Sequence, residues 1–232
     1  MMESRWADCN DVSQMLDIIR DAGQTSVRKL RLFAVSCCRR IWSLFPNDRC
    51  RQMVEAAELF ADGLISDRDL AGADNDLSHV AWDSIPPDQP DWEYVFGFAL
   101  HAAEYLTEKN AITLAWGSAE HSSNASAAAA SRTSGTHIQV AKEREDASQA
   151  SILRDIFGNP FRLVTLDQRW LSTTVLDLAG TIYQERAFER LPILADALMD
   201  AGCDSEEIIN HCHSGGQHVR GCWVVDSLLA KV

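Results

Sequence analysis

The side chains best suited to chemistry gather near the end of the chain, in the stretch NHCHSGGQHVRGCW at residues 210–223. Histidine nitrogens and cysteine thiolates are the usual ligands of a structural zinc ion, which needs four of them around one point. The spacing here matches no familiar zinc motif, but one short segment supplies enough ligands. Zinc is therefore the one cofactor that the sequence suggests. The candidate ligands are His211, His213, His218 and Cys222.

A turn between two helices would explain the same stretch without a metal. Gly215 and Gly216 could take the left-handed backbone conformations that end one helix and begin the next. Histidines near a helix C-terminus interact favourably with the helix dipole. Cys222 could be a small buried residue of a last helix that begins near Gln217, where it would share a face with His218. From the sequence we favour the turn and keep zinc as the alternative.

Basic side chains on one helix form a second candidate site. Residues 24–51 carry seven Lys or Arg against one acid, whereas residues 52–110 carry two basic and thirteen acidic residues. A basic helix face could bind phosphate or an acidic partner, or it could pair with the acidic segment inside the fold, which we favour. The net charge of −13 argues against a dedicated nucleic-acid binder. The residues on this face are Arg28, Lys29, Arg39 and Arg40.

Motifs of known enzyme classes are missing. The chain has no glycine-rich phosphate loop, no H-E-x-x-H and no G-x-S-x-G. His101 with Glu104, and Glu120 with His121, could serve acid–base chemistry, but such neighbours often arise by chance on helices. The sequence therefore leans against an enzyme, and we assign no catalytic residue.

The adjacent thiols of Cys37 and Cys38 have two interpretations. Arg39 and Arg40 could lower a thiol pKa and make it reactive. Adjacent helical residues point about 100° apart, so the two thiols are poorly placed to hold one ion. We favour small buried residues on a core helix.

The composition is that of an ordinary folded protein, with 46% hydrophobic and 24% charged residues in a chain of 232. No apolar run reaches the length of a membrane span, and the first residues lack the features of a signal peptide. Seven cysteines form no even framework, which fits free thiols in a reducing compartment. We expect a soluble, cytoplasmic protein.

Helical periodicity dominates the chain, and strand alternation of useful length is missing. The sequence predicts an all-α protein, a bundle-like array of about nine or ten helices without a substantial sheet. Three prolines in IPPDQPDW (residues 85–92) predict a loop, between a helix over 66–83 and one that Asp91 caps. RLVTL at residues 162–166 could be extended. The other candidate caps are Asn10 or Asp11, Thr25 or Ser26, Asn47 or Asp48, and Ser172 or Thr173.

An alanine- and serine-rich stretch suggests how the domains are organised. We expect an N-terminal helical lobe over 1–117 and a C-terminal lobe over 137–232, joined by a connecting segment over 118–136. Alanine favours helix, so this segment is better interpreted as a helix than as a flexible linker. One continuous domain is the alternative.

Two long phrases carry a resemblance. One is RKLRLFAVSCCRRIWSLF, and the other is LRDIFGNPFRLVTLDQRW with the later LPILADALMDAGCD and HVRGCWVVD. From about Trp6 to Lys231 the chain resembles a large group of uncharacterised proteins abundant in planctomycete bacteria, least so in the alanine-rich middle. The resemblance implies no activity, ligand or site residue. The sequence as a whole favours a non-enzymatic helical module that binds a protein partner. A structural zinc protein is the first alternative, and an enzyme of unrecognised class is the second.

Overall fold

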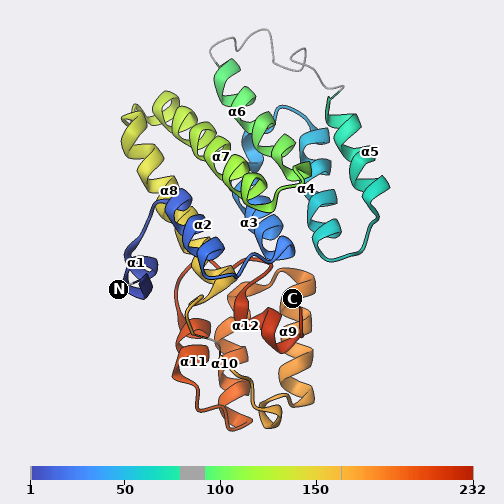
Figure 1. Cartoon of the computed structure of the whole chain (residues 1–232), viewed down its shortest axis with the longest axis vertical. Helices are drawn as coiled ribbons and strands as arrows, with labels where there is room; N and C mark the ends of the chain where they lie inside the picture. The colour runs from blue at the N-terminus through green and yellow to red at the C-terminus, as the bar shows by residue number, and fades with distance from the viewer. Residues whose placement is uncertain (1, 79–91, 163, 232) are drawn as a thin grey trace. The chain divides into compact units, whose positions relative to one another are not determined.

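The computed structural model describes residues 2–78, 92–162 and 164–231, and over these residues the chain is all-α (Figure 1). The described residues form twelve α-helices and several short 3₁₀ turns, and they contain no strand. The predicted fold class is confirmed. The end of the helix expected over 66–83, most of IPPDQPDW and the capping Asp91 lie outside the described residues. None of the helices that the structure describes has the length and hydropathy that crossing a bilayer requires.

The chain divides into two compact units, residues 1–150 and 151–232, each with its own hydrophobic core. The boundary therefore lies after the segment 118–136 that the sequence suggests as the connection. Residues 118–134 are part of one long helix, and residues 135–136 directly follow it. The whole segment lies inside the first unit.

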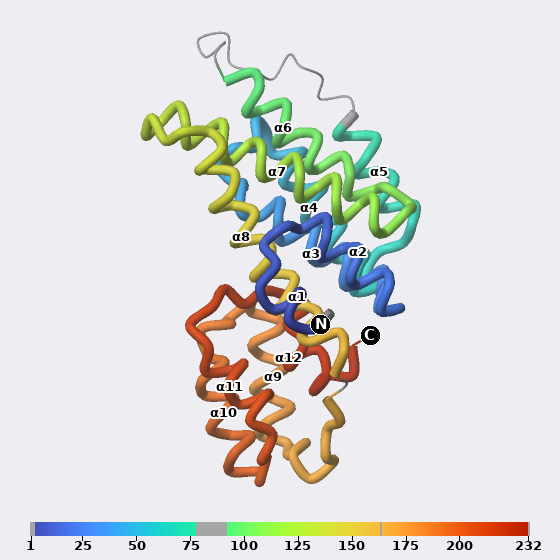
Figure 2. The backbone as a smooth tube through the Cα atoms, turned by 60° about the vertical axis from the view of Figure 1, so that its left-hand side comes forward, coloured from blue at the N-terminus to red at the C-terminus, as the bar shows by residue number. Residues whose placement is uncertain are grey.

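Helix α3 lies at the centre of the first unit, where it packs against α4, α6 and α7 (Figures 1 and 2). Residues with short polar side chains begin several of the helices: the Asp11, Ser26 and Asn47 side chains each accept a backbone N–H of the first turn. The helices are α1 (Met2–Asp8), α2 (Val12–Asp21), α3 (Val27–Arg40), α4 (Asp48–Ala61), α5 (Asp67–Ser78), α6 (Glu93–Glu104), α7 (Ala111–Ser134) and most of α8 (Ile138–Phe157).

Helix α3 is buried over most of its length, from Leu30 to Cys38. Cys37 and Cys38 are both 0% exposed, and burial raises the pKa of each thiol well above its ordinary value. A buried thiol that keeps its proton is a poor nucleophile. The pair therefore acts as two small apolar residues of the core.

The alanine-rich stretch is helical, as predicted. The side chain of Asn110 accepts the backbone N–H groups of Ile112 and Thr113 at the start of α7, and Gly135 ends the helix with a φ of +67°. Small residues let α7 approach its neighbours closely. Gly117 is the tightest point, because a Cβ atom there would overlap the ring carbons of Tyr105.

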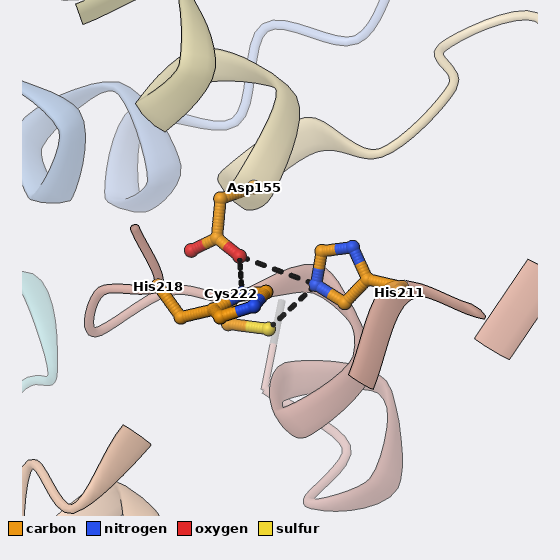
Figure 3. Close-up of side chains that lie close together, drawn as sticks. All are labelled: Asp155, His211, His218 and Cys222. Carbon is orange, nitrogen blue, oxygen red and sulfur yellow. Dashed lines mark hydrogen bonds and ion pairs between the residues drawn. The ribbon is translucent and has the colours of Figure 1, made fainter. Parts of the chain in front are cut away.

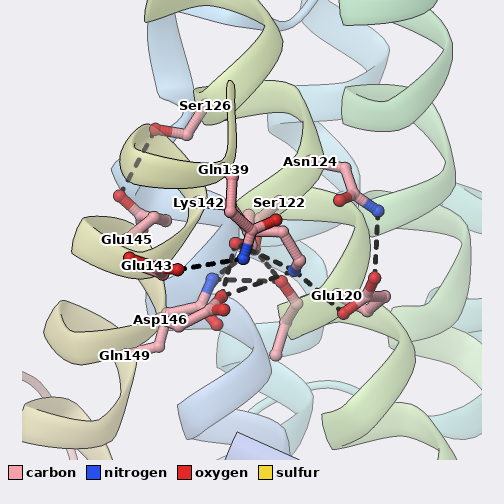
Figure 4. Close-up of polar contacts among 12 residues, drawn as sticks. Glu120, Ser122, Asn124, Ser126, Gln139, Lys142, Glu143, Glu145, Asp146 and Gln149 are labelled. Carbon is pink, nitrogen blue, oxygen red and sulfur yellow. Dashed lines mark hydrogen bonds and ion pairs between the residues drawn. The ribbon is translucent and has the colours of Figure 1, made fainter. Parts of the chain in front are cut away.

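Polar side chains join α7 to α8 within the first unit (Figure 4). The ammonium of Lys142 lies 3.1 Å from the Glu120 carboxylate and 3.5 Å from that of Asp146. The buried amide of Gln149 donates to the Ser122 hydroxyl at 3.0 Å. These contacts give the two helices partners for polar groups that would otherwise be costly to bury.

The second unit is a smaller helical array in which α10 packs against α9 and α11, and α12 packs against the same two helices (Figure 1). The Trp170 indole N–H donates to the Gly202 carbonyl at 3.1 Å and ties the start of the unit to the end of α10. Besides the end of α8, the helices are α9 (Thr173–Glu185), α10 (Leu191–Asp200), α11 (Glu206–His213) and α12 (Trp223–Leu228).

Candidate metal centre

Four potential metal ligands of the second unit meet in one place (Figure 3). Asp155 lies in the last turn of α8, His211 in the last turn of α11, and His218 and Cys222 on the segment that leads into α12. One ligand atom from each residue can be chosen so that all lie within 4.8 Å of one another. Gly158, with a φ of +61°, ends α8 just after Asp155 and packs against the Trp223 indole.

Asp155 is the centre of the cluster. Its Oδ1 lies 2.6 Å from Nδ1 of His218 and 3.2 Å from Nε2 of His211, and its Oδ2 accepts the backbone N–H of Val219 at 2.9 Å. Burial alone would raise the pKa of this carboxyl, but the hydrogen bonds and charges of the two histidines outweigh it, and the pKa is lowered. A buried carboxylate that stays ionised is a ready ligand for a cation.

Asp155 also shifts the pKa of His218. Burial lowers the pKa of this imidazole, but the hydrogen bond and charge of Asp155 more than offset that effect, and the pKa is raised. The other ring nitrogen, Nε2, lies 3.1 Å from the hydroxyl oxygen and 3.3 Å from the carbonyl oxygen of Ser214. A histidine that binds a metal through one nitrogen commonly donates its other N–H to such an oxygen.

His211 contacts both remaining members of the cluster. Its Nε2 lies 3.1 Å from Sγ of Cys222, and its Nδ1 accepts the indole N–H of Trp223 at 3.0 Å. The Cys222 side chain is fully buried, and burial raises the pKa of its thiol well above the ordinary value. Without a cation the thiol therefore keeps its proton.

Three of the four ligands predicted from the sequence belong to this cluster, namely His211, His218 and Cys222. The fourth, His213, is exposed and lies outside it. Asp155, which the sequence analysis missed, takes its place. The only hint in the sequence is an acidic residue among the apolar residues of LRDIF, close to the helix-ending Gly158.

The predicted turn differs from the observed one. Neither Gly215 nor Gly216 has a left-handed φ, and α11 ends instead at Ser214 with extended backbone. The last helix begins at Trp223 and not near residue 217. Gly221 has a φ of +99°, which is not a helical conformation, so a helix cannot continue through it. His218 and Cys222 therefore do not share a helix face. A folded segment brings them together.

The basic residues proposed as a partner site lie in the first unit, where the arginines pair with carboxylates. Arg28 binds Asp62 at 3.0 Å and Arg39 binds Glu58 at 2.7 Å. Arg40 pairs with the buried Glu145, where Nη2 lies 2.9 Å from Oε2. Pairing with the acidic segment 52–110, the interpretation that we favour from the sequence, accounts for Arg28 and Arg39. The partner of Arg40, Glu145, lies outside that segment. Partner binding through Arg28, Lys29, Arg39 and Arg40 stays a prediction.

The two acid–histidine pairs also lie in the first unit. Nδ1 of His101 is 2.7 Å from the Glu104 carboxylate on the same helix, with both side chains partly exposed. His121 packs among aromatic rings, with ring centroids 5.3 Å from those of His101 and Tyr105.

Searches against protein-family models, curated proteins and solved structures find no match to this chain. Membership in the planctomycete group stays a prediction, and the function has to be argued from the cluster itself.

Proposed function

We propose that the C-terminal unit, residues 151–232, is a zinc-binding module whose ligands are Asp155, His211, His218 and Cys222. The observation that carries the proposal is the convergence of these four donor atoms within 4.8 Å. They come from three separate parts of the unit, so one ion would tie together the end of α8, the end of α11 and the start of α12. Such an ion would stabilise the unit in the way of a structural zinc site.

The donor set supports zinc over calcium or magnesium. Those two cations prefer oxygen ligands, whereas two imidazoles, one thiolate and one carboxylate suit zinc in a tetrahedral site. Charge balance also supports zinc. The Asp155 carboxylate and the Cys222 thiolate together neutralise a divalent ion, so no net charge would be buried. Four protein ligands leave no open position, which favours a structural role over a catalytic one.

Binding would require three proton changes. Nδ1 of His218 has to lose the proton that it now donates to the Asp155 carboxylate. The Cys222 thiol has to lose its proton, and zinc stabilises the thiolate enough to overcome the raised pKa. Nε2 of His211 has to present a lone pair to the ion, although the indole of Trp223 now directs the ring proton to this nitrogen. Zinc affinity should therefore fall as the pH is lowered.

Zinc titration of the metal-free protein tests the proposal, using a competing chromophoric chelator. We expect Asp155→Asn and Cys222→Ser each to weaken zinc binding by about a hundredfold or more, because each variant loses a metal ligand. His213→Ala, on the same turn of α11 but outside the cluster, should bind as the wild type does. Cys212→Ser is the matched control for loss of a buried thiol.

Two results would contradict the proposal. One is the absence of stoichiometric binding by the folded wild type. The other is equal affinity in Cys222→Ser and Cys212→Ser. Circular dichroism of each variant shows whether it is folded before the titration begins, so a loss of binding is not confused with a loss of structure.

A further inference from the structure

A cavity of about 580 Å³ lies in the first unit, lined by the start of α2 and by residues of α7 and α8. Its wall carries one ammonium, that of Lys142, and the carboxylates of Asp11, Glu120, Glu143 and Asp146. Four negative charges against one positive charge give the wall a net charge of −3. A hollow lined mainly by one sign of charge attracts ligands of the opposite sign, so the cavity favours a cation.

The spacing of these carboxylates does not suit a metal ion. In the described part of the chain, Asp155 and its three partners are the only group of acidic, histidine and cysteine side chains close enough to hold one. A cation that meets several carboxylates of the cavity must therefore carry its charges on separate atoms. A linear organic amine with two or more ammonium groups has that property.

Lys142 shows how the cavity holds an alkylammonium group (Figure 4). Its Nζ lies 3.1 Å from the carboxylate of Glu120, 3.3 Å from the hydroxyl of Ser123 and 3.5 Å from the carboxylate of Asp146. The protein's own ammonium therefore neutralises part of the charge of Glu120 and Asp146.

Asp11 and Glu143 are the carboxylates that a ligand could neutralise. Asp11 accepts hydrogen bonds from Gln14, and Glu143 accepts one from Gln139. Neither carboxylate pairs with an Arg, Lys or His among the described residues. Both side chains are exposed, so an ammonium group could pair with each of them without a large desolvation cost.

Gln149 gives an independent indication of a ligand. This residue lines the cavity and is only 1% exposed. Its Nε2 donates to the carbonyl of Ala119 and to the hydroxyl of Ser122, each at 3.0 Å. Because a carbonyl can only accept, these contacts fix which end of the amide carries the N–H groups. No described residue donates to Oε1, and this atom is not sealed off by the protein. A donor from a ligand would satisfy it.

Trp116 adds an aromatic surface to the same cavity, and its side chain is 42% exposed. The face of an indole ring attracts cations and also packs well against methylene groups.

We infer that this cavity binds a linear polyamine. Separate ammonium groups pair with Asp11 and Glu143, an amine N–H donates to Oε1 of Gln149, and the methylene chain lies on the indole of Trp116. The inference concerns the first unit alone and does not rest on the proposed zinc site.

Isothermal titration calorimetry of the full chain with spermidine tests the inference. We expect saturable binding of one spermidine per chain, and binding weaker by about fivefold or more for n-butylamine, which has a single ammonium group. Mg²⁺ should compete no better than Na⁺ at the same ionic strength, because the carboxylates do not converge on one point. Absence of spermidine binding, or equal affinity for spermidine and n-butylamine, would overturn the inference.

Variants of the acidic residues separate a specific site from general attraction to an acidic protein. Glu143→Gln should weaken spermidine binding by about threefold. Asp11→Asn should do the same, and it keeps the start of α2 intact because asparagine is an equally good helix cap. Glu55→Gln removes the same charge from an exposed position outside the cavity and should bind as the wild type does. Equal losses in Glu143→Gln and Glu55→Gln would contradict a site in the cavity.

The roles of Trp116 and Gln149 have their own measurements. Trp116→Ala should weaken binding by about fivefold, whereas Tyr94→Ala, which removes an exposed aromatic ring outside the cavity, should not. The side-chain amide resonances of Gln149, assigned with Gln149→Met, should shift when spermidine binds. Normal affinity in folded Trp116→Ala, together with unchanged Gln149 resonances at saturation, would place the ligand elsewhere and overturn the inference.

Discussion

The indole N–H of Trp223 donates a hydrogen bond to Nδ1 of His211 over 3.0 Å. Indole is a donor only, so Nδ1 must be the acceptor and the ring proton of the neutral imidazole lies on Nε2. That proton faces Asp155 and Cys222, which lie 3.2 and 3.1 Å from Nε2. Without a metal, both ring nitrogens of His211 therefore have hydrogen-bond partners. Zinc binding has to break some of these hydrogen bonds.

The first prediction follows from this contact. When zinc takes Nε2 of His211, the remaining ring proton moves to Nδ1 and faces another N–H, so the hydrogen bond to Trp223 must open. We expect the indole N–H resonance of Trp223, assigned with Trp223→Phe, to shift on addition of one equivalent of zinc. An unchanged indole resonance in zinc-saturated protein would exclude His211 as a ligand through Nε2.

The second prediction concerns the close approach of Gly117 to Tyr105. A methyl group at residue 117 would overlap the tyrosine ring, so Gly117→Ala should lower the free energy of unfolding by about 1–3 kcal/mol. Gly72→Ala is the control, since it lies on an exposed part of α5 with no atom near its added Cβ. It should raise stability by about 0.5–1 kcal/mol. Urea denaturation measures both, and equal changes in the two variants would refute the packing account.

The third prediction concerns the buried pair of Arg40 and Glu145. Their side chains are 23% and 7% exposed, so removal of one charge leaves the other poorly solvated. Glu145→Gln should destabilise the protein by about 3 kcal/mol. Glu143→Gln, an exposed position on the same helix, should have almost no effect. A Glu145→Gln variant as stable as its control would show that the pair contributes little.

The fourth prediction is a pH dependence that originates at His121. Burial, with the nearby His101 as a smaller cause, lowers the pKa of this imidazole, and its buried Nδ1 has no hydrogen-bond partner among the residues that the structure describes. Folding therefore favours the neutral ring. The unfolded chain binds the proton near the ordinary pKa of about 6.5, so stability should fall as the pH drops below that value.

His121→Phe should remove this contribution, which makes the wild type lose stability more steeply than the variant between about pH 6.5 and 5. His137→Gln, an exposed histidine of the same unit, should retain the wild-type slope. Thermal unfolding across this pH range measures the difference. Parallel curves for wild type and His121→Phe would contradict a lowered pKa.

The sequence predicted the helices well because their signals are local. Capping side chains, apolar spacing and the φ-positive glycines at residues 23, 63 and 135 act within one or two turns of the chain. The cluster depends on contacts between elements, which local patterns do not encode. His211 and His213 illustrate the difficulty, since they flank the buried Cys212 on the same turn of α11. His211 belongs to the cluster because the segment that contains Cys222 and Trp223 packs against its side of α11.

Asp155 was missed for the same reason. In the sequence it is one acidic residue near the end of a helix, and its partners His218 and Val219 lie far along the chain. Spacing within NHCHSGGQHVRGCW could suggest the ligand types but not the buried carboxylate that completes the set. The sequence predicted too long a last helix, because no proline or obvious cap marks the loop before Trp223.

The zinc content of the purified, reduced and untagged protein tests the central claim most directly. Elemental mass spectrometry should find about one zinc per chain, and treatment with a chelator should lower the melting temperature until zinc is restored. Cys222→Ser should lose the metal, whereas His213→Ala should keep it. A wild type without metal, whose melting temperature responds neither to chelator nor to added zinc, would contradict the claim. Asp155, His211, His218 and Cys222 would then be a purely hydrogen-bonded cluster.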